Sequence, residues 1–261
     1  MKQAHPNRLF RGVASPVLLI IAWELIGRTL AGSGRIPYPT LILNRAVSLS
    51  LSGELPLALG YSLARVLTGV LVAATIAAAV AICTICLPRT GRRLEQIVEL
   101  FRPIPAIALL PLAILWFGPG TPAAIFVVSY AAFFPLVTNA IAGIRSVDRG
   151  LVAAARTMGL STPAVLRFVV LPASMPRLMT GVRVGLGTAW LSIIAAELAV
   201  GSISGSGGVG GLGQMMFIFY AFSTDLRGII VCMITVGLSG LTIDLSLRGL
   251  WGWLAPWERT R

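Results

Sequence analysis

Residues 153–172 read AAARTMGLSTPAVLRFVVLP and interrupt a chain that is otherwise dominated by long apolar segments. Gly159 and Pro163 break this stretch, and Arg156 and Arg167 add charge to it. A helix that crosses a membrane needs about 20 predominantly apolar residues, so this stretch is not a membrane span. We interpret residues 153–172 as a short helix-turn-helix, called the elbow here, that offers a surface to a soluble partner.

The composition of the whole chain indicates a membrane location. Of 261 residues, 56% are hydrophobic and only 11% are charged, and the mean hydropathy is +0.88. A soluble domain carries about 25% charged residues, so this chain has too few charges to cover a water-exposed surface. Because backbone groups in lipid must be hydrogen-bonded within each segment, we predict an all-α membrane protein.

Six apolar segments are long enough to be transmembrane helices, and together they form a membrane domain of residues 13–250. We place the six spans at residues 13–31, 56–86, about 95–118, 122–144, 181–200 and 228–250. Polar tails, residues 1–12 and 251–261, flank this domain. Prolines in the third span predict a kink, which is tolerated where protein or a water-filled cavity surrounds the helix. Between the first two spans we expect a loop with an interfacial helix.

The distribution of basic residues predicts the orientation of the six spans. Most of the 21 basic residues lie in the segments that share a side with the N-terminus. The positive-inside rule then places both chain ends and the loop 145–180, which contains the elbow, in the cytoplasm. This distribution explains the net charge of +12 without a nucleic acid partner. Arg65, near the outer end of the second span, is expected to reach toward the lipid headgroups.

The residues that enzymes and ATP sites need are scarce in this chain. Lys2 is its only lysine, whereas a Walker A loop needs a lysine after its glycines. Any ATP hydrolysis must therefore come from a partner. The chain has one histidine and neither an HExxH nor a GxSxG motif, which argues against a membrane-embedded enzyme. We predict no catalytic residue, no bound cofactor and no metal ion, and we interpret the CxxC of Cys83 and Cys86 as apolar packing.

Each residue that breaks the elbow suits a particular position in a helix-turn-helix. Gly159 fits the left-handed position after the first helix, and Ser161 or Thr162 fits the cap of the second. Pro163 fits the first turn of that second helix, which a Leu-Pro pair is expected to close. The exposed residues are small and apolar, which is typical of a partner surface.

This pattern resembles the EAA loop of ATP-binding-cassette (ABC) importer permeases. That loop reads Glu-Ala-Ala, three residues, Gly, nine residues, an aliphatic residue, one residue and Leu-Pro. The chain departs from it at Ala153, where the pattern has glutamate. The segments ELFRPIPAIALLPLAILWFG (99–118), GVRVGLGTAWLSIIAAEL (181–198) and LAPWE (254–258) resemble the branch that imports nitrate, sulfonates and taurine. The likeness extends over roughly residues 15–257.

The resemblance implies a binding-protein-dependent importer in the inner membrane of a bacterium. Two copies of this chain would form the pathway through the lipid, and two ABC ATPases that bind ATP and Mg²⁺ would dock on the cytoplasmic elbows. An extracytoplasmic binding protein would deliver the substrate to the outer loops. The implied coupling residues are Ala153, Ala154, Ala155, Gly159, Leu160, Ser161, Pro163, Leu171 and Pro172.

Several residues inside the spans are candidates for the translocation pathway or its gate. A carboxylate in a span is costly, so Glu197 either acts in the pathway or pairs with a partner such as Arg65. Asp244 precedes Arg248 by one helical turn, and an ion pair on one helix face is a sufficient explanation for it. The small polar residues also suit hydrogen bonds between helices. The further candidates are Trp190, Ser192, Asn139, Pro105, Ser129 and Thr138.

These observations favour a permease subunit for a small anion. We expect an aliphatic sulfonate such as taurine first and a nitrate-like oxyanion second. A heterocyclic vitamin precursor is the alternative within the same fold. A secondary transporter driven by an ion gradient is the alternative from another class, with Glu197 or Asp244 as its proton site. The glycine-rich segment 205–210 matches GxGxxG but follows no predicted strand, so we interpret it as an outer loop or a re-entrant segment rather than a dinucleotide site.

Overall fold

The computed structural model describes residues 6–29, 37–204 and 210–254, and all regular secondary structure in these residues is helical. Four helices are long and apolar enough to cross a membrane, or up to five if a sharply bent pair counts as one span. The four are α3 (Glu54–Cys86), α6 (Thr121–Arg145), α9 (Leu171–Ser204) and α11 (Leu226–Leu254). The prediction of an all-α membrane protein is confirmed, whereas the count of six spans and their orientation stay predictions.

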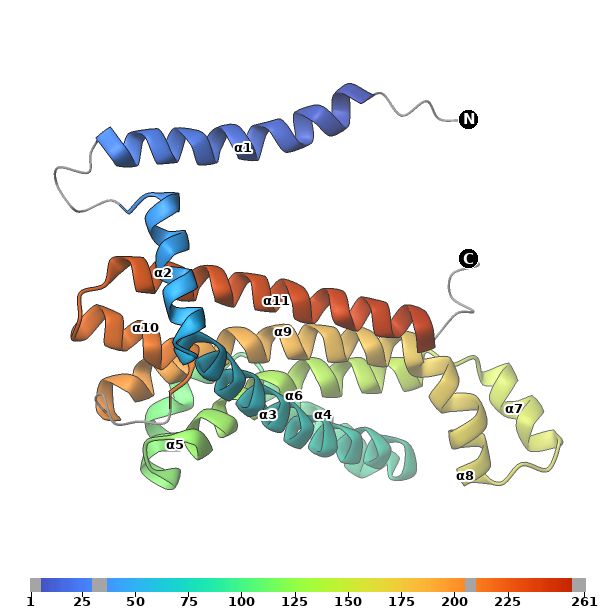
Figure 1. Ribbon diagram of the computed structural model, residues 1–261. Helices are drawn as coiled ribbons and strands as arrows, with labels where there is room; N and C mark the ends of the chain where they lie inside the picture. The colour runs from blue at the N-terminus through green and yellow to red at the C-terminus, as the bar shows by residue number, and fades with distance from the viewer. Residues whose placement is uncertain (1–5, 30–36, 205–209, 255–261) are drawn as a thin grey trace.

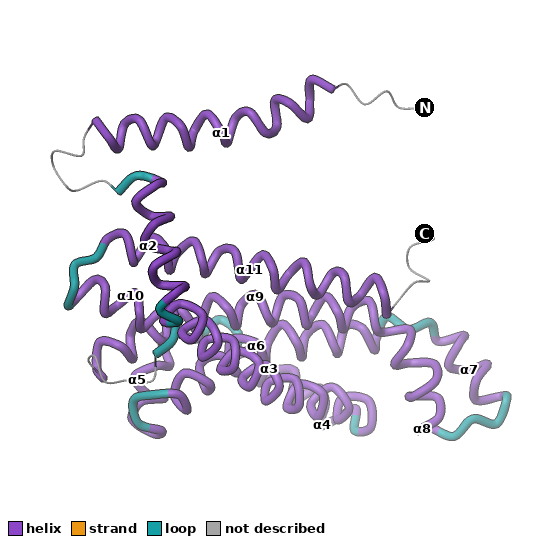
Figure 2. The backbone as a smooth tube through the Cα atoms, in the orientation of Figure 1, coloured by secondary structure: helices purple, strands orange, loops and turns teal. Residues whose placement is uncertain are grey.

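Helix α6 lies at the centre of the bundle, between α3 and α9 (Figures 1 and 2). Small residues allow these close approaches. A Cβ atom at Gly69 of α3 would lie 2.6 Å from the Val128 side chain of α6, and one at Gly181 of α9 would lie 2.7 Å from Cβ of Asn139. Membrane helices associate through such small residues because lipid provides no hydrophobic driving force between them.

The predicted third span is two helices rather than one kinked helix. Helix α4 (Pro88–Phe101) ends before Pro103, and a bend of 89° separates it from the short η2 (Ala106–Leu109) and α5 (Leu110–Phe117). Pro105 adopts an extended backbone with φ −62° and ψ 130°. Two prolines separated by one residue remove two helical donors and restrict the residues before them, which breaks the helix.

The segment after the fifth span also differs from the prediction. Between the predicted spans 181–200 and 228–250, where no helix was predicted, the structure has a further helix, α10 (Leu212–Ala221), which packs on α9. Its buried residues Leu212, Met215 and Phe219 recur at helical spacing, although the preceding glycines obscured this signal. The GxGxxG segment lies outside the described residues except for Gly210.

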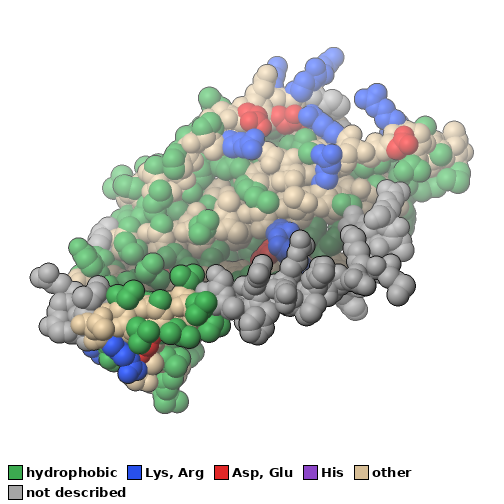
Figure 3. Space-filling model, turned by 90° about the horizontal axis from the view of Figure 1, so that it is seen from above, with side chains coloured by type: hydrophobic (Ala, Val, Ile, Leu, Met, Phe, Trp, Pro, Cys, Tyr) green, Lys and Arg blue, Asp and Glu red, His purple; other side chains and the backbone are tan. Residues whose placement is uncertain are grey.

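Two N-terminal helices precede the bundle. Helix α1 (Pro6–Thr29) begins earlier than the predicted first span, and α2 (Pro39–Leu51) follows it and packs on α11. An ion pair of 2.7 Å between Arg45 and Asp225 ties α2 to the start of α11. Hydrophobic side chains cover much of the face shown in Figure 3, and charged side chains form only a few groups on it. Such a surface suits lipid contact.

Gly181→Ala tests the close packing of α6 and α9. The added methyl group would overpack this interface, which typically costs about 1–3 kcal/mol in the free energy of unfolding. Gly187→Ala is the matched control on the same helix, because a Cβ there meets nothing within 4 Å. We expect thermal unfolding in detergent, followed by tryptophan fluorescence, to show a lower midpoint for Gly181→Ala only. Equal midpoints for the two variants would contradict the packing described here.

Candidate functional site

The elbow is a helix-turn-helix that projects beyond one end of the bundle (Figure 1). Its first helix is the end of α7 (Arg149–Thr157), and its second comprises α8 (Thr162–Val165) and the π-helical η3 (Leu166–Val170). Gly159 has a φ of +83°, as predicted for a left-handed turn position. The amide of Leu160 then donates back to the Ala155 carbonyl at 3.2 Å.

The second half of the elbow is continuous with α9, so the predicted break at Leu171 and Pro172 is wrong. Residues Thr162–Gly201 form one continuous helical stretch. Pro172 stands in the first turn of α9, directly after the π-helical turn of η3, and a proline is tolerated at the start of a helix. The elbow is therefore joined to α9 without a flexible connection.

The surface that the elbow presents is mostly apolar. Met158 and Phe168 are 73% and 66% exposed, and Leu171 is 46% exposed. Of the predicted coupling residues, Ala155 is buried and Leu160 is half-buried. The exposed ones are Ala153, Ala154, Gly159, Ser161, Pro163, Leu171 and Pro172. A projecting apolar surface of this kind is typical of a protein interface.

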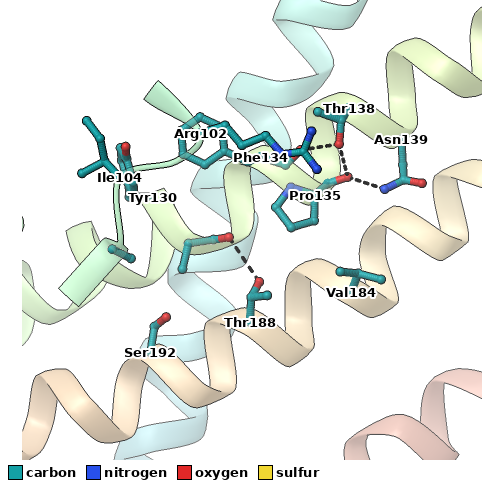
Figure 4. A pocket seen from close by; sticks show the side chains of 12 residues that line it. Arg102, Ile104, Tyr130, Phe134, Pro135, Thr138, Asn139, Val184, Thr188 and Ser192 are labelled. Carbon is teal, nitrogen blue, oxygen red and sulfur yellow. Dashed lines mark hydrogen bonds between the residues drawn. The ribbon is translucent and has the colours of Figure 1, made fainter. Parts of the chain in front are cut away.

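A second site is a cavity of about 380 Å³ beside α6 (Figure 4). Its walls come from α6 between Tyr130 and Asn139, from α9, and from the break between α4 and η2. Three predicted pathway residues line it: Thr138, Asn139 and Ser192. Pro105 is exposed and lies between two lining residues, Ile104 and Ala106. Ser129 instead lines an apolar groove on another face of α6.

The cavity is centred on the proline within α6. Pro135 has no N–H for the Ala131 carbonyl, and the Thr188 hydroxyl of α9 donates to that carbonyl at 3.1 Å. The Asn139 side-chain amide donates to the Pro135 carbonyl at 2.8 Å. These contacts appear as dashed lines in Figure 4. Backbone carbonyls therefore hold the side chains of Thr138, Asn139 and Thr188 in place.

Glu197 lies outside this cavity, in a buried network that joins three helices. Its side chain is only 1% exposed and accepts hydrogen bonds from Arg65 Nη1 at 2.7 Å and Ser62 Oγ at 2.8 Å. The Gly213 amide, in the first turn of α10, donates to the same carboxylate at 3.1 Å. The predicted pairing with Arg65 is present, and a role of Glu197 in the pathway or gate stays a prediction.

The prediction that Arg65 reaches toward the lipid headgroups is wrong. Its side chain is only 8% exposed and lies inside the protein. Its Nε also donates to the Thr121 hydroxyl of α6 at 3.1 Å. The buried Glu197 carboxylate compensates the charge inside the protein and the Thr121 hydroxyl accepts a further hydrogen bond, so the side chain need not reach the headgroups. Glycine at 211 is required beside this network, since a Cβ there would collide with the Glu197 carboxylate.

The remaining predicted residues lie at the interface of α9 and α11. Trp190 is buried, and its indole nitrogen donates to the Val236 carbonyl at 3.1 Å. Asp244 pairs with Arg248, as predicted, at 2.9 Å. It also pairs with Arg183 of α9, a partner that the sequence analysis missed because it is distant along the chain. Arg102, which lines the cavity, was counted only as an inner basic residue.

Glu197→Gln tests whether the buried network stabilises the fold. Removing one partner of a buried ion pair leaves an uncompensated charge, here that of Arg65, and costs about 3–5 kcal/mol. We expect a large drop in the thermal midpoint, which the double variant Arg65→Met with Glu197→Gln reverses in part. Glu99→Gln, which breaks an ion pair with both side chains more than half exposed, is the control and leaves the midpoint nearly unchanged. An unchanged midpoint with lost transport would instead assign Glu197 to the gate.

Known relatives match nearly the whole chain. Residues 72–260 match the family described as "Binding-protein-dependent transport system inner membrane component". The taurine transport system permease protein TauC of Escherichia coli is 33% identical, and the match covers 93% of this chain and 87% of TauC. The putative aliphatic sulfonates transport permease protein SsuC of Escherichia coli is 36% identical, with 90% of this chain and 88% of SsuC covered.

A solved structure shares the fold. The inward-facing MetNI methionine ABC transporter matches with a TM-score of 0.63 and 20% identity, over 77% of this chain and 96% of the matched chain. The resemblance to the nitrate, sulfonate and taurine branch is thus confirmed by the relatives, and the helical arrangement by the solved structure. The chain belongs to the family of binding-protein-dependent ABC importer permeases and is a translocation subunit of such a transporter.

Proposed function

We propose that this permease carries a small organic or inorganic anion, with aliphatic sulfonates such as taurine first and nitrate-like oxyanions second. The observation that carries the proposal is the similarity over 90% or more of the chain to permeases named for taurine and aliphatic sulfonates. Two copies of the chain form the pathway, in a bacterial cytoplasmic membrane. An extracytoplasmic binding protein delivers the substrate.

ATP hydrolysis is coupled to transport through the elbow. Two ABC ATPases, which hold ATP and Mg²⁺, dock on the elbows of the two copies at the cytoplasmic face. Both chain ends lie on this face, and six spans cross the membrane. Because Thr162–Gly201 is one helical stretch, a displacement of the elbow displaces α9. Thr188 and Ser192 of α9 line the cavity, so the displacement changes the cavity's walls.

The predicted pathway residues take different roles in this scheme. Asn139 and Ser192 face the substrate, and Pro105 shapes the break that borders their cavity. Trp190 and Glu197 do not line the cavity and instead position α9. Trp190 holds α9 against α11, and Glu197 holds α9 against α3 and α10. Both Glu197 and Asp244 are paired with arginines, which disfavours a proton-carrying role and hence the secondary transporter.

Reconstitution tests the proposed function. The permease is purified with its cognate ATPases and binding protein, placed in liposomes, and assayed for uptake of taurine, ethanesulfonate and nitrate. We expect uptake of at least one of these anions only with ATP and the binding protein. A thermal-shift screen of the binding protein with the same compounds identifies which one it retains. Transport that survives ATP depletion, or no binding of any ATPase, would reject the importer mechanism.

Gly159→Glu tests the role of the elbow. It places a bulky charge at the turn that the ATPase is proposed to contact, so we expect loss of substrate-stimulated ATP hydrolysis with an intact permease dimer on gel filtration. Gly159→Asn is the matched control, because asparagine tolerates the left-handed conformation and adds no charge. It should retain most of the stimulated hydrolysis. Loss of the dimer itself in Gly159→Glu would contradict a coupling role.

A further inference from the structure

Arg102 occupies an unusual position for a charged residue of a membrane domain. It follows α4 directly, at the 89° bend, and its side chain lines the cavity beside α6. Among the lining residues it is the one that carries a formal charge. In Figure 4 it extends along the cavity toward Thr138. Its side chain is more than half exposed and forms part of the cavity wall, so a ligand in the cavity can reach it.

The fold fixes the place of Arg102. Pro105 has no N–H for the Phe101 carbonyl, and the Tyr130 hydroxyl of α6 donates to this carbonyl at 2.7 Å. The end of α4 is thereby anchored to α6 just before Arg102. The residue after Arg102 is also a proline, so the guanidinium is presented from a backbone that cannot relax into a continuous helix.

The ion pair of Arg102 with its neighbour in sequence does not explain why a charged residue lies at the cavity. Its acidic neighbour is Glu99, and the distance between Nη1 and Oε1 is 3.6 Å. The two side chains are 57% and 63% exposed. Exposed pairs of this kind contribute little, about 0–1 kcal/mol. The positive charge therefore remains available to a ligand in the cavity.

We propose that Arg102 coordinates the anionic group of the substrate during its passage, which makes it a specificity-determining residue of the permease itself. The proposal rests on the anion substrate proposed above. A guanidinium presents its donors as a planar fork that matches two oxygens of an oxyanion such as a sulfonate. Ile104, Phe134 and Val184 add apolar walls for a short alkyl chain.

The cavity is large enough to hold a small anion. Its volume of about 380 Å³ lies in the range of small-molecule sites, which begins at about 300 Å³. Because the Arg102 side chain is more than half exposed, its pair with an anion remains partly solvated and is weak. Weak coordination admits an anion from the binding protein and still releases it to the cytoplasm.

Arg102→Gln in the reconstituted transporter tests this assignment. We expect ethanesulfonate uptake to fall about fivefold, as for the loss of a partly solvated ion pair at the upper end of its usual contribution. Stimulation of ATP hydrolysis by the loaded binding protein should persist, because the elbow is unchanged. Arg102→Lys keeps the charge and should retain a larger share of the uptake. Glu99→Gln is the matched control and should transport like the parent protein.

The outcomes separate this inference from the proposed function. If the parent protein imports sulfonate and Arg102→Gln imports it equally well, the inference is overturned and the proposed function stands. If Glu99→Gln loses as much uptake as Arg102→Gln, the arginine serves only its pair with Glu99 and the inference fails as well. If the parent imports none of the tested anions, the substrate class is wrong. In that case, calorimetric titration of the permease–ATPase complex with ethanesulfonate, without the binding protein, decides whether Arg102 binds an anion. Binding that Arg102→Gln abolishes supports the inference. Any other result overturns it.

Discussion

The buried ion pair between Arg65 and Glu197 is the constraint on which the arrangement of the helices depends. Both side chains are almost completely enclosed, and an unpaired charge in such a place costs several kcal/mol. The pair is satisfied only if α3, α9 and the first turn of α10 meet at this point, because Ser62 and the Gly213 amide complete its hydrogen bonds. Ser62 also accepts a hydrogen bond from the Leu212 amide. The network thus closes the end of the bundle that is opposite the elbow.

Helix α9 connects this end of the bundle to the elbow. It begins at the elbow, passes the cavity with Thr188 and Ser192, and reaches Glu197 near its own end. The elbow and the Glu197 network are thus joined by helical backbone, in which α9 contains one proline beyond its first turn, Pro176. Midway along it, the Thr188 hydroxyl donates to the Ala131 carbonyl of α6, which Pro135 leaves without a helical donor. This side-chain hydrogen bond keeps the carbonyl paired at the point where α6 cannot pair it.

Local signals made much of this architecture predictable from the sequence. The spacing of Gly159 and Pro163 defined the elbow, and the cost of a carboxylate in a span singled out Glu197 together with Arg65. Interactions between distant segments were harder to foresee. At the bend at Pro103 and Pro105, the Tyr130 hydroxyl of α6 binds the end of α4. The helix continues through Leu171 and Pro172 because the π-helical turn of η3 precedes them. Arg183 contacts Asp244 only in the folded bundle. Helix α10 was missed because glycines precede a short buried face.

The balance of charge within the membrane domain links the stability of the fold to its substrate. Glu197 is neutralised by Arg65, and Asp244 by Arg183 and Arg248, so neither carboxylate presents a free negative charge to the pathway. Among the residues that line the cavity beside α6, the one with a formal charge is Arg102. The Arg102 side chain is more than half exposed and its pair with Glu99 is weak, so no buried carboxylate cancels this charge. Because the carboxylates of Glu197 and Asp244 are matched by arginines, the anion coordination that we propose needs only one further arginine, Arg102.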